Sequence, residues 1–232
     1  MKISDLAISS YGYINFTDYS ASYQRFRDNV GYRCDLTNAE HRKALLAWLN
    51  NWGCRQFSKD YRRVSSKQIL LWYEEYADML FPSGKGLLVL NGHELEKAYE
   101  AFESLAGKVA SIREKNEKKH RVTVGLTGAS KILFAIRPEA LVAWDKAIRE
   151  GLKADGIGTT YIDFLSLVRS DMLSIKEECI RRNLSLQSLP KKLNRSKDTI
   201  PQLIGEYYWA KYTRGCTIPD WTYLKRLADW AR

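Results

Sequence analysis

Apolar residues recur at spacings of three and four along most of this chain, which is the spacing of one face of an α-helix. One such set is Ala44, Leu45, Trp48, Leu49 and Trp52. It follows a capping-box sequence in which the hydroxyl of Thr37 and the carboxylate of Glu40 can each bond a free backbone amide. The pattern therefore predicts a helix that begins at this capping box.

The same spacing predicts several further helices. Ser66 can cap a helix that ends before Pro82, and other runs fit residues 94–113, 161–182, 185–193, 200–212 and 219–230. Only residues 86–90 and 121–124 look like strands, and short apolar runs of this kind can equally be buried turns. We expect an all-α protein, folded over residues 1–232 as one compact multi-helix domain or as two packed helical lobes with a seam near residues 82–92.

Composition narrows the class of protein. Of the 232 residues, 45% are apolar, which is enough for a substantial core. No apolar run approaches the roughly 20 residues needed to cross a membrane, and the first residues lack the apolar core of a signal peptide. We therefore expect a soluble, cytoplasmic protein with no membrane role, associated with the nucleoid if it acts on DNA.

Basic residues outnumber acidic ones, 37 against 27, which gives a net charge of +10. They gather in residues 59–67, 115–121 and 176–197. Such an excess favours a polyanionic partner such as nucleic acid, although solvated helix faces carry similar charge runs. Candidates for contacts with DNA phosphates are Arg55, Lys118, Lys119 and Arg121.

The cysteines and histidines form no metal-binding pattern. The widely spaced cysteines include no Cys-x-x-Cys pair and lie near no histidine cluster; they are Cys34, Cys54, Cys179 and Cys216. We expect reduced, mostly buried thiols and neither a metal ion nor another cofactor.

One lysine and one aspartate stand out as a candidate catalytic pair. Lys131 opens a helix-like run just after a glycine turn, and Asp145 follows in a second helix-like run. If the two helices pack side by side, the amine and the carboxylate share one cleft. In the alternative, structural reading, Lys131 covers apolar surface and Asp145 caps the helix that begins at Lys146.

Residues 126–152 resemble the helix-hairpin-helix DNA glycosylases. In that family a glycine hairpin lets backbone amides approach a DNA phosphate, and the helix that follows can begin with a lysine. The stretch Thr127-Gly128-Ala129-Ser130-Lys131 looks like that hairpin and lysine, with Ser130 in place of the second glycine. The segment around Asp145 resembles the one that carries the family's aspartate. The resemblance implies that Thr127, Gly128 and Ser130 contact the DNA backbone.

The resemblance also implies a mechanism that these residue types can support. An enzyme of this family would act on duplex DNA with one nucleotide extruded from the stack. Asp145 would stabilise positive charge at the sugar as a damaged or modified base departs. Lys131 would attack the anomeric carbon and form a Schiff base that permits strand cleavage. Such an enzyme would serve DNA repair or defence against foreign modified DNA.

Aromatic side chains are candidates for a base pocket. Trp48, Trp52 and Trp144 could each stack on an extruded base. Trp48 and Trp52 lie four residues apart on an amphipathic helix, however, and this spacing is typical of core residues.

Two functions without catalysis remain open. In the first, a basic helical module binds DNA or RNA, with Gly128 and its neighbouring amides at a phosphate and Lys131 adding only charge. In the second, the basic surface docks an acidic protein partner, and binding to duplex DNA would then be weak and unselective even at low salt.

Overall fold

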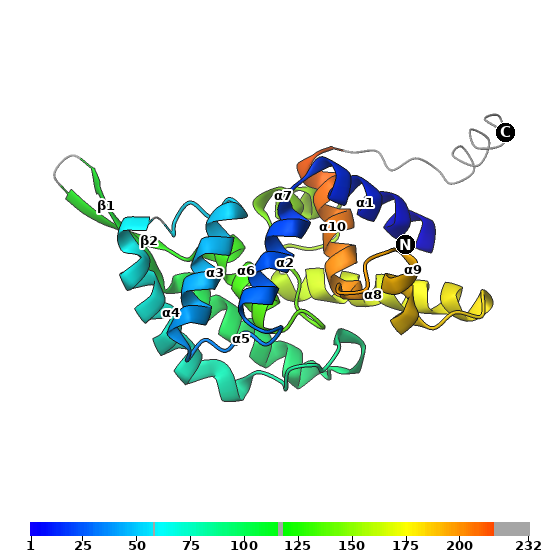
Figure 1. Ribbon diagram of the computed structural model, residues 1–232, viewed down its shortest axis with the longest axis horizontal. Coiled ribbons are helices and arrows are strands. Elements are labelled where there is room, and N and C mark those ends of the chain that lie inside the picture. Colours follow the sequence, from blue (N-terminus) through cyan, green and yellow to red (C-terminus); the bar gives the residue numbers. More distant parts are fainter. Residues whose placement is uncertain (58, 116–117, 216–232) are drawn as a thin grey trace. The chain divides into compact units, whose positions relative to one another are not determined.

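The computed structural model describes residues 1–57, 59–115 and 118–215, and this part of the chain is largely helical (Figure 1). It contains ten α-helices, four short 3-10 helices and one two-stranded sheet. The protein is therefore all-α, as the apolar spacing predicts. None of the helices in these ranges is both long enough and apolar enough to cross a membrane.

The chain divides into two compact units. Unit 2 comprises Asp18–Asp145 apart from the residues that are not described, whereas unit 1 combines residues 1–17 with the described residues from 146 to 215. Residues 82–92, where the sequence predicts a seam, lie inside unit 2. The chain passes from one unit to the other after Thr17 and again after Asp145.

Unit 2 is built around one buried helix, α6 (Gly125–Ile136), in which every residue from Gly128 to Ile136 is buried. A helix that is buried on all sides belongs in a core, and α6 packs against α5 (Gly92–Gly107) and α3 (Ala39–Asn51). The other elements of this unit are α2 (Tyr19–Asn29), η1 (Lys59–Tyr61), α4 (Arg62–Tyr76), η2 (Ala77–Met79), η3 (Leu87–Val89), β1 (Val109–Lys115) and β2 (Lys118–Thr123).

Two helix starts differ from those that the sequence predicts. The side chain of Asn38 caps α3 by accepting a hydrogen bond from the Glu40 amide at 2.8 Å. The Thr37 hydroxyl donates instead to Asp35 at 2.8 Å, so the expected Thr37 cap is wrong by one residue. Ser66 caps no helix either, because it lies inside α4.

The expected helix over residues 94–113 ends early, at Gly107. The residues that follow form β1, which pairs with β2 in an antiparallel hairpin that places Ile112 opposite Arg121. β-Branched residues suit a strand, but it is the partner strand that satisfies the backbone groups of β1. The strand expected over residues 121–124 is confirmed as far as Thr123, whereas residues 87–89 form a 3-10 helix.

Unit 1 consists of α1 (Ile3–Phe16), α7 (Lys146–Ala154), α8 (Tyr161–Arg181), η4 (Leu186–Ser188), α9 (Leu189–Lys192) and α10 (Ile200–Thr213). α10 packs against α1, α7 and α8. The helices expected over residues 161–182 and 200–212 are confirmed to within one residue, and the run 185–193 is divided between η4 and α9. The helix expected over residues 219–230 lies outside the described residues, as does Cys216.

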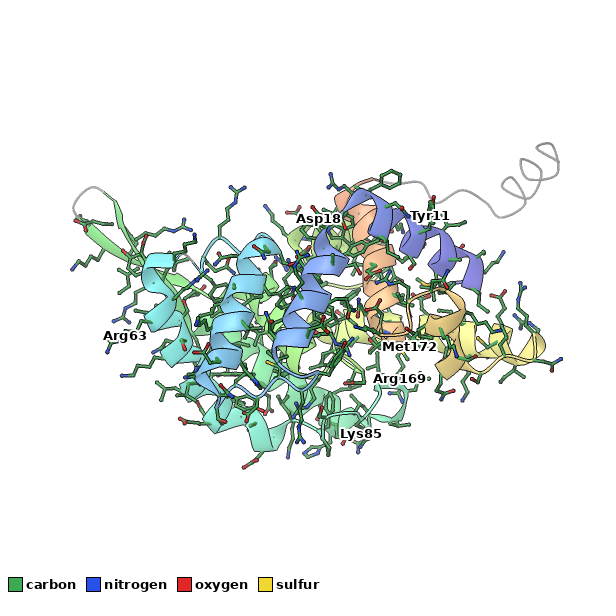
Figure 2. The ribbon with its side chains drawn as sticks, in the orientation of Figure 1. Tyr11, Asp18, Arg63, Lys85, Arg169 and Met172 are labelled. Atoms are coloured by element: carbon green, nitrogen blue, oxygen red, sulfur yellow. The ribbon has the colours of Figure 1, made fainter. Side chains whose placement is uncertain are left out.

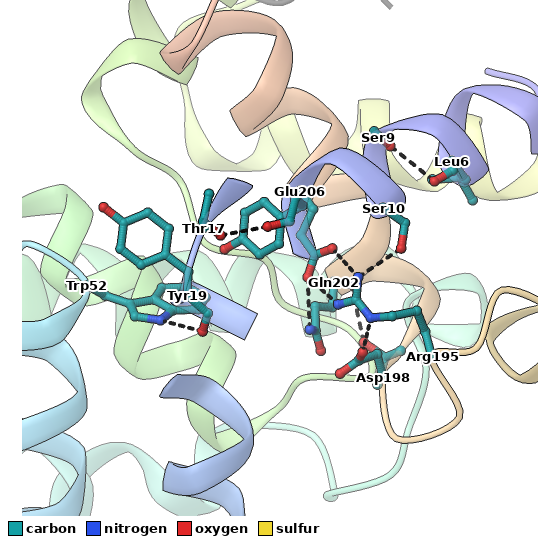
Figure 3. A network of polar contacts seen from close by, with 12 residues as sticks. Leu6, Ser9, Ser10, Thr17, Tyr19, Trp52, Arg195, Asp198, Gln202 and Glu206 are labelled. Carbon is teal, nitrogen blue, oxygen red and sulfur yellow. Dashed lines mark hydrogen bonds and ion pairs between the residues drawn. The ribbon is translucent and has the colours of Figure 1, made fainter. Parts of the chain in front are cut away.

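A buried ion-pair network stabilises unit 1 (Figure 3). Arg195 donates to Glu206 at 2.7 and 2.8 Å and to Ser10 at 2.8 Å, and it also pairs with Asp198. Burial disfavours the charged guanidinium, but the Glu206 and Asp198 carboxylates outweigh it and raise the pKa of Arg195. Arg195 belongs to the basic run at residues 176–197, which favours contact with a polyanionic partner. Because its side chain is only 4% exposed, Arg195 is not available for that contact.

Candidate active site

Lys131 and Asp145 meet within unit 2. The Lys131 Nζ lies 3.0 Å from Asp145 Oδ1, and the two side chains are 6% and 22% exposed. The same Nζ donates a hydrogen bond to the backbone oxygen of Trp52 at 2.8 Å. The neighbouring amine, Lys146, is 78% exposed and pairs with Glu150 instead. The structure therefore joins one amine to one carboxylate and leaves the carboxylate the more accessible of the two.

Asp145 reaches Lys131 by a different path from the one that the sequence predicts. Lys131 lies in the middle of α6 rather than at its start, and residues 137–145 are not helical. The end of this segment is fastened to α6 by Ser130, whose Oγ accepts a hydrogen bond from the Trp144 amide at 2.9 Å. Ser130 Oγ also donates to the backbone oxygen of Thr127 at 3.1 Å. This one buried hydroxyl thus holds Asp145 beside Lys131.

The expected glycine hairpin at residues 127–131 is wrong. The left-handed turn lies at Gly125, where φ is +67°, and the residues after it already belong to α6. Gly128 serves packing, because a Cβ there would lie 2.8 Å from Gln56 Nε2. Since Gly128 and Ser130 are buried inside the helix, their amides are bonded within it and do not face a phosphate.

Trp52 connects the pair to the end of α3. It is the C-cap residue of that helix, where the backbone carbonyls carry partial negative charge that favours a nearby cation. The Lys131 Nζ also lies 5.5 Å from the centre of the Trp52 ring, within the range of a cation–π interaction. The indole N–H donates to the backbone oxygen of Tyr19 at 3.1 Å (Figure 3). These contacts orient both the ammonium and the ring.

Of the three tryptophans expected at a base pocket, only Trp52 is partly exposed. Trp48 and Trp144 are each 2% exposed. Trp48 stacks on Phe26 with ring centres 5.0 Å apart, and Trp144 lies 6.1 Å from Phe102. Because neighbouring side chains already cover their rings, Trp48 and Trp144 are core residues and do not line a base pocket.

A third ionisable group, the Cys54 thiol, lies beside the pair and is 2% exposed. Burial raises the pKa of this thiol to about 11, with Lys131 opposing the rise and Asp145 adding to it. The thiol is therefore neutral at pH 7 and unsuited to nucleophilic attack. No spacing in the sequence indicates this placement, because only tertiary packing brings Cys54 to Lys131.

Replacing Cys54 by alanine is expected to make the protein less sensitive to alkaline pH. The thiol has an ordinary pKa of 9.0 in the unfolded chain but about 11 in the folded protein. The wild type therefore keeps this contribution to stability below pH 9 and loses it as the pH rises towards 11. Urea unfolding measures the free energy of unfolding of both proteins. Between about pH 8 and pH 10.5 the wild type should lose about 2 kcal/mol more of this free energy than the variant does. A difference that stays constant over this range would contradict the placement of Cys54.

Replacing Ser130 by alanine is expected to lower the free energy of unfolding by about 1–3 kcal/mol, because the buried Trp144 amide loses its acceptor. Urea denaturation measures the loss. Ser174→Ala is the matched control, since the Ser174 hydroxyl donates to the Ser170 carbonyl at 3.2 Å in an exposed position. Equal losses in the two variants would show that Ser130 does not anchor the segment that carries Asp145.

Exposed basic residues lie on α4 and on β2, where Lys118 and Lys119 are at the end of the strand next to the hairpin turn. Lys118, Lys119 and Arg121 are exposed on β2, and Arg63 of α4 points outward (Figure 2). β1 packs on α4, so two clusters that are far apart in sequence come to neighbouring elements. We call these residues the basic hairpin face: Arg63, Lys67, Lys118, Lys119 and Arg121. Arg55 is also exposed, in the turn after α3.

No protein-family model, curated protein or solved structure matches this chain. Within residues 1–57, 59–115 and 118–215, no three His, Cys, Asp or Glu side chains are grouped as they would be to hold a metal ion. The function is therefore inferred from the residues of the site and from the charges around it.

Proposed function

We propose that this protein removes a base from DNA, with Asp145 and Lys131 as its catalytic residues. The observation that carries the proposal is the 3.0 Å pairing of Lys131 Nζ with Asp145 Oδ1 next to the partly exposed Trp52. Cleavage of an N-glycosidic bond requires negative charge facing the sugar, and a nucleophile on the same side makes the reaction faster. Asp145 supplies the first and Lys131 the second.

The chemistry begins with heterolysis of the bond between the sugar C1′ and the base nitrogen. The base leaves with both bonding electrons and takes up a proton. Asp145 stabilises the positive charge that develops on the sugar, as a carboxylate does in glycoside cleavage. Lys131 then loses a proton to water, turns away from the Trp52 carbonyl and donates its electron pair to C1′. Opening of the sugar ring gives a Schiff base, from which strand cleavage can follow.

The basic hairpin face supports a DNA partner. Its five cations are exposed side chains of α4 and β2, where they can neutralise phosphates and release bound counterions. A two-stranded ribbon such as β1–β2 also has the dimensions that the major groove of a duplex admits. The proposed binding surface is therefore this hairpin together with α4.

Replacing Lys118 and Lys119 together by alanine is expected to weaken binding to duplex DNA and to reduce its dependence on salt. If each lysine contacts one phosphate, the slope of log affinity against log salt concentration should become shallower by about 1.8. Fluorescence anisotropy with a labelled duplex measures this slope. Lys191→Ala with Lys192→Ala is the matched control, since both lysines are exposed on α9; equal slopes for the two double variants would argue against the hairpin face.

The catalytic proposal is tested with a duplex that already contains an abasic site, because the aldehyde of that site reacts with an active amine whichever base is the natural substrate. Borohydride reduction should trap wild-type protein on this duplex and should not trap Lys131→Gln. Lys85→Gln is the matched control, since Lys85 also forms a partly exposed ion pair, with Glu94 at 2.5 Å. A panel of duplexes with damaged or modified bases then measures base release.

The outcomes separate the mechanisms. Trapping that needs Lys131 supports the Schiff base, whereas base release without trapping points to water as the nucleophile and leaves Asp145 as the electrostatic catalyst. Trapping that is unchanged in Lys131→Gln would contradict the role of Lys131. The absence of both trapping and base release would contradict the proposal that this protein is a base-removing enzyme.

A second candidate function is nucleic-acid binding without catalysis. It is favoured by the 6% exposure of the Lys131 side chain and by the bond from Nζ to the Trp52 carbonyl, which together suit a lysine that holds α6 to the end of α3. In that case neither the wild type nor Lys131→Gln would show borohydride trapping or base release, and the hairpin variant would still lose DNA affinity.

A further inference from the structure

A cavity of about 910 Å³ lies in unit 2, where the segment before α3, the end of α4 and the segment after α6 meet. Cavities that hold small molecules commonly have this size. Its charged lining consists of Arg33, Arg137, Asp35, Asp78 and Glu139. Neither the basic hairpin face nor the Lys131–Asp145 pair contributes a residue to this lining.

Arg137 is a buried cation in this lining; among the described residues it forms no ion pair with a carboxylate, although the nearby Glu139 carboxylate acts on it electrostatically. Arg137 is 9% exposed; its Nε donates to the backbone oxygen of Phe81 at 2.7 Å and its Nη1 to that of Ile136 at 2.8 Å. The guanidinium also hydrogen-bonds the Tyr73 side chain, and burial lowers the pKa of Arg137. A guanidinium has more N–H donors than these contacts use. Within the described ranges, no carboxylate lies within ion-pair distance of it, so its remaining N–H donors favour an acceptor oxygen of a ligand.

Carboxylates in the same lining accept hydrogen bonds, whereas Arg137 donates them. Glu139 Oε2 is shielded from solvent and has no hydrogen-bond partner among the residues described, which leaves acceptor capacity on this carboxylate. Asp35 is fixed by the Thr37 amide at 2.9 Å and the Thr37 hydroxyl at 2.8 Å. The ligand of this cavity should therefore carry N–H donors as well as an acceptor.

The remaining lining suits a flat ring. Tyr73 is half-buried at the wall, and Leu80 and Pro82 add apolar surface. A planar base can stack on such an aromatic ring. Arg33 is exposed, so its guanidinium can reach a phosphate that extends towards solvent.

We propose that this cavity binds a guanine nucleotide. Guanine places a carbonyl oxygen next to two N–H donor groups on one edge, so a single base can accept hydrogen bonds from Arg137 and donate to Glu139. Adenine presents an unprotonated ring nitrogen where guanine has its N–H, and that nitrogen would face the carboxylate unfavourably. Arg33 would bind the phosphate, and Tyr73 would stack on the base.

The proposal is tested by calorimetric titration of the whole 232-residue chain with GMP, AMP, IMP and inorganic phosphate. GMP should bind at least about 10-fold more tightly than AMP, which corresponds to the discrimination given by one good bidentate contact to a base. IMP lacks the exocyclic amine and should bind with intermediate affinity. Inorganic phosphate should bind more weakly than all three nucleotides.

Glu139→Gln should weaken GMP binding about 10-fold, because an amide replaces the charged acceptor. Glu74→Gln is the matched control, since Glu74 is exposed on α4 and does not line the cavity. Arg33→Ala should weaken GMP but not guanosine. Because Arg137 also holds backbone carbonyls, its own replacement could unfold the chain, and the test therefore depends on Glu139 and Arg33.

Equal affinities for GMP and AMP, or phosphate binding as tight as GMP binding, would overturn the proposal in favour of a simple anion site. A lack of GMP binding would overturn it outright, as would GMP binding that Glu139→Gln leaves unchanged. Lys131→Gln should bind GMP like the wild type, so failure of base excision and failure of nucleotide binding are distinguishable.

Discussion

Replacing Asp145 by asparagine is expected to reduce the rate of base release by about 10²- to 10³-fold, the effect of removing one preorganised electrostatic contact to a transition state. Asparagine has nearly the same volume as aspartate but no charge, so it removes the interaction with the sugar and leaves the shape of the site. Single-turnover release of the base from a modified duplex measures the effect, and DNA affinity should remain close to that of the wild type.

Asp155→Asn is the control for this experiment. Asp155 also pairs with a lysine, Lys211 at 2.9 Å, and accepts a hydrogen bond from Tyr212 at 2.6 Å. It lies in unit 1 and has no part in the proposed chemistry, so its replacement should leave base release unchanged. Equal rates of base release by Asp145→Asn and Asp155→Asn would show that Asp145 has no catalytic role.

Replacing Arg195 by methionine is expected to lower the free energy of unfolding by about 3–5 kcal/mol, the range observed when one partner of a buried ion pair is removed. Glu206 and Asp198 would both remain buried, with side chains 5% and 4% exposed, and would face each other's charge without the guanidinium. Urea denaturation followed by circular dichroism measures the change.

Arg182→Met is the matched control for Arg195→Met. The Arg182 side chain is 60% exposed and pairs with Glu178, whose side chain is 12% exposed, at 2.7 Å. Because the Arg182 guanidinium reaches solvent, its replacement should cost less than that of Arg195, nearer the roughly 1 kcal/mol of a surface ion pair. Similar losses in the two variants would show that the Arg195 network is not the main polar contribution to the stability of unit 1.

The sequence predicted that Lys131 and Asp145 lie close together only if their two segments pack against each other. The segments do meet, but through the Ser130 hydroxyl and a non-helical stretch rather than through two packed helices. A hydrogen bond between residues fourteen positions apart leaves no periodic trace in a sequence. The hairpin predicted at Gly128 failed for a related reason: a glycine is compatible both with a turn and with close packing. The close approach of Gln56, Val124 and Phe57 shows that packing applies here.

Local spacing was sufficient for the all-α class and for helices such as α8 and α10, because helical hydrogen bonds join residues four positions apart and the buried face repeats with the same period. Tertiary structure alone decided that Val109–Lys115 is a strand, that Arg195 is buried, and that Arg137 lines a cavity. Each of these outcomes depends on a partner far away in the chain, and which distant residues come into contact is fixed by packing rather than by local sequence.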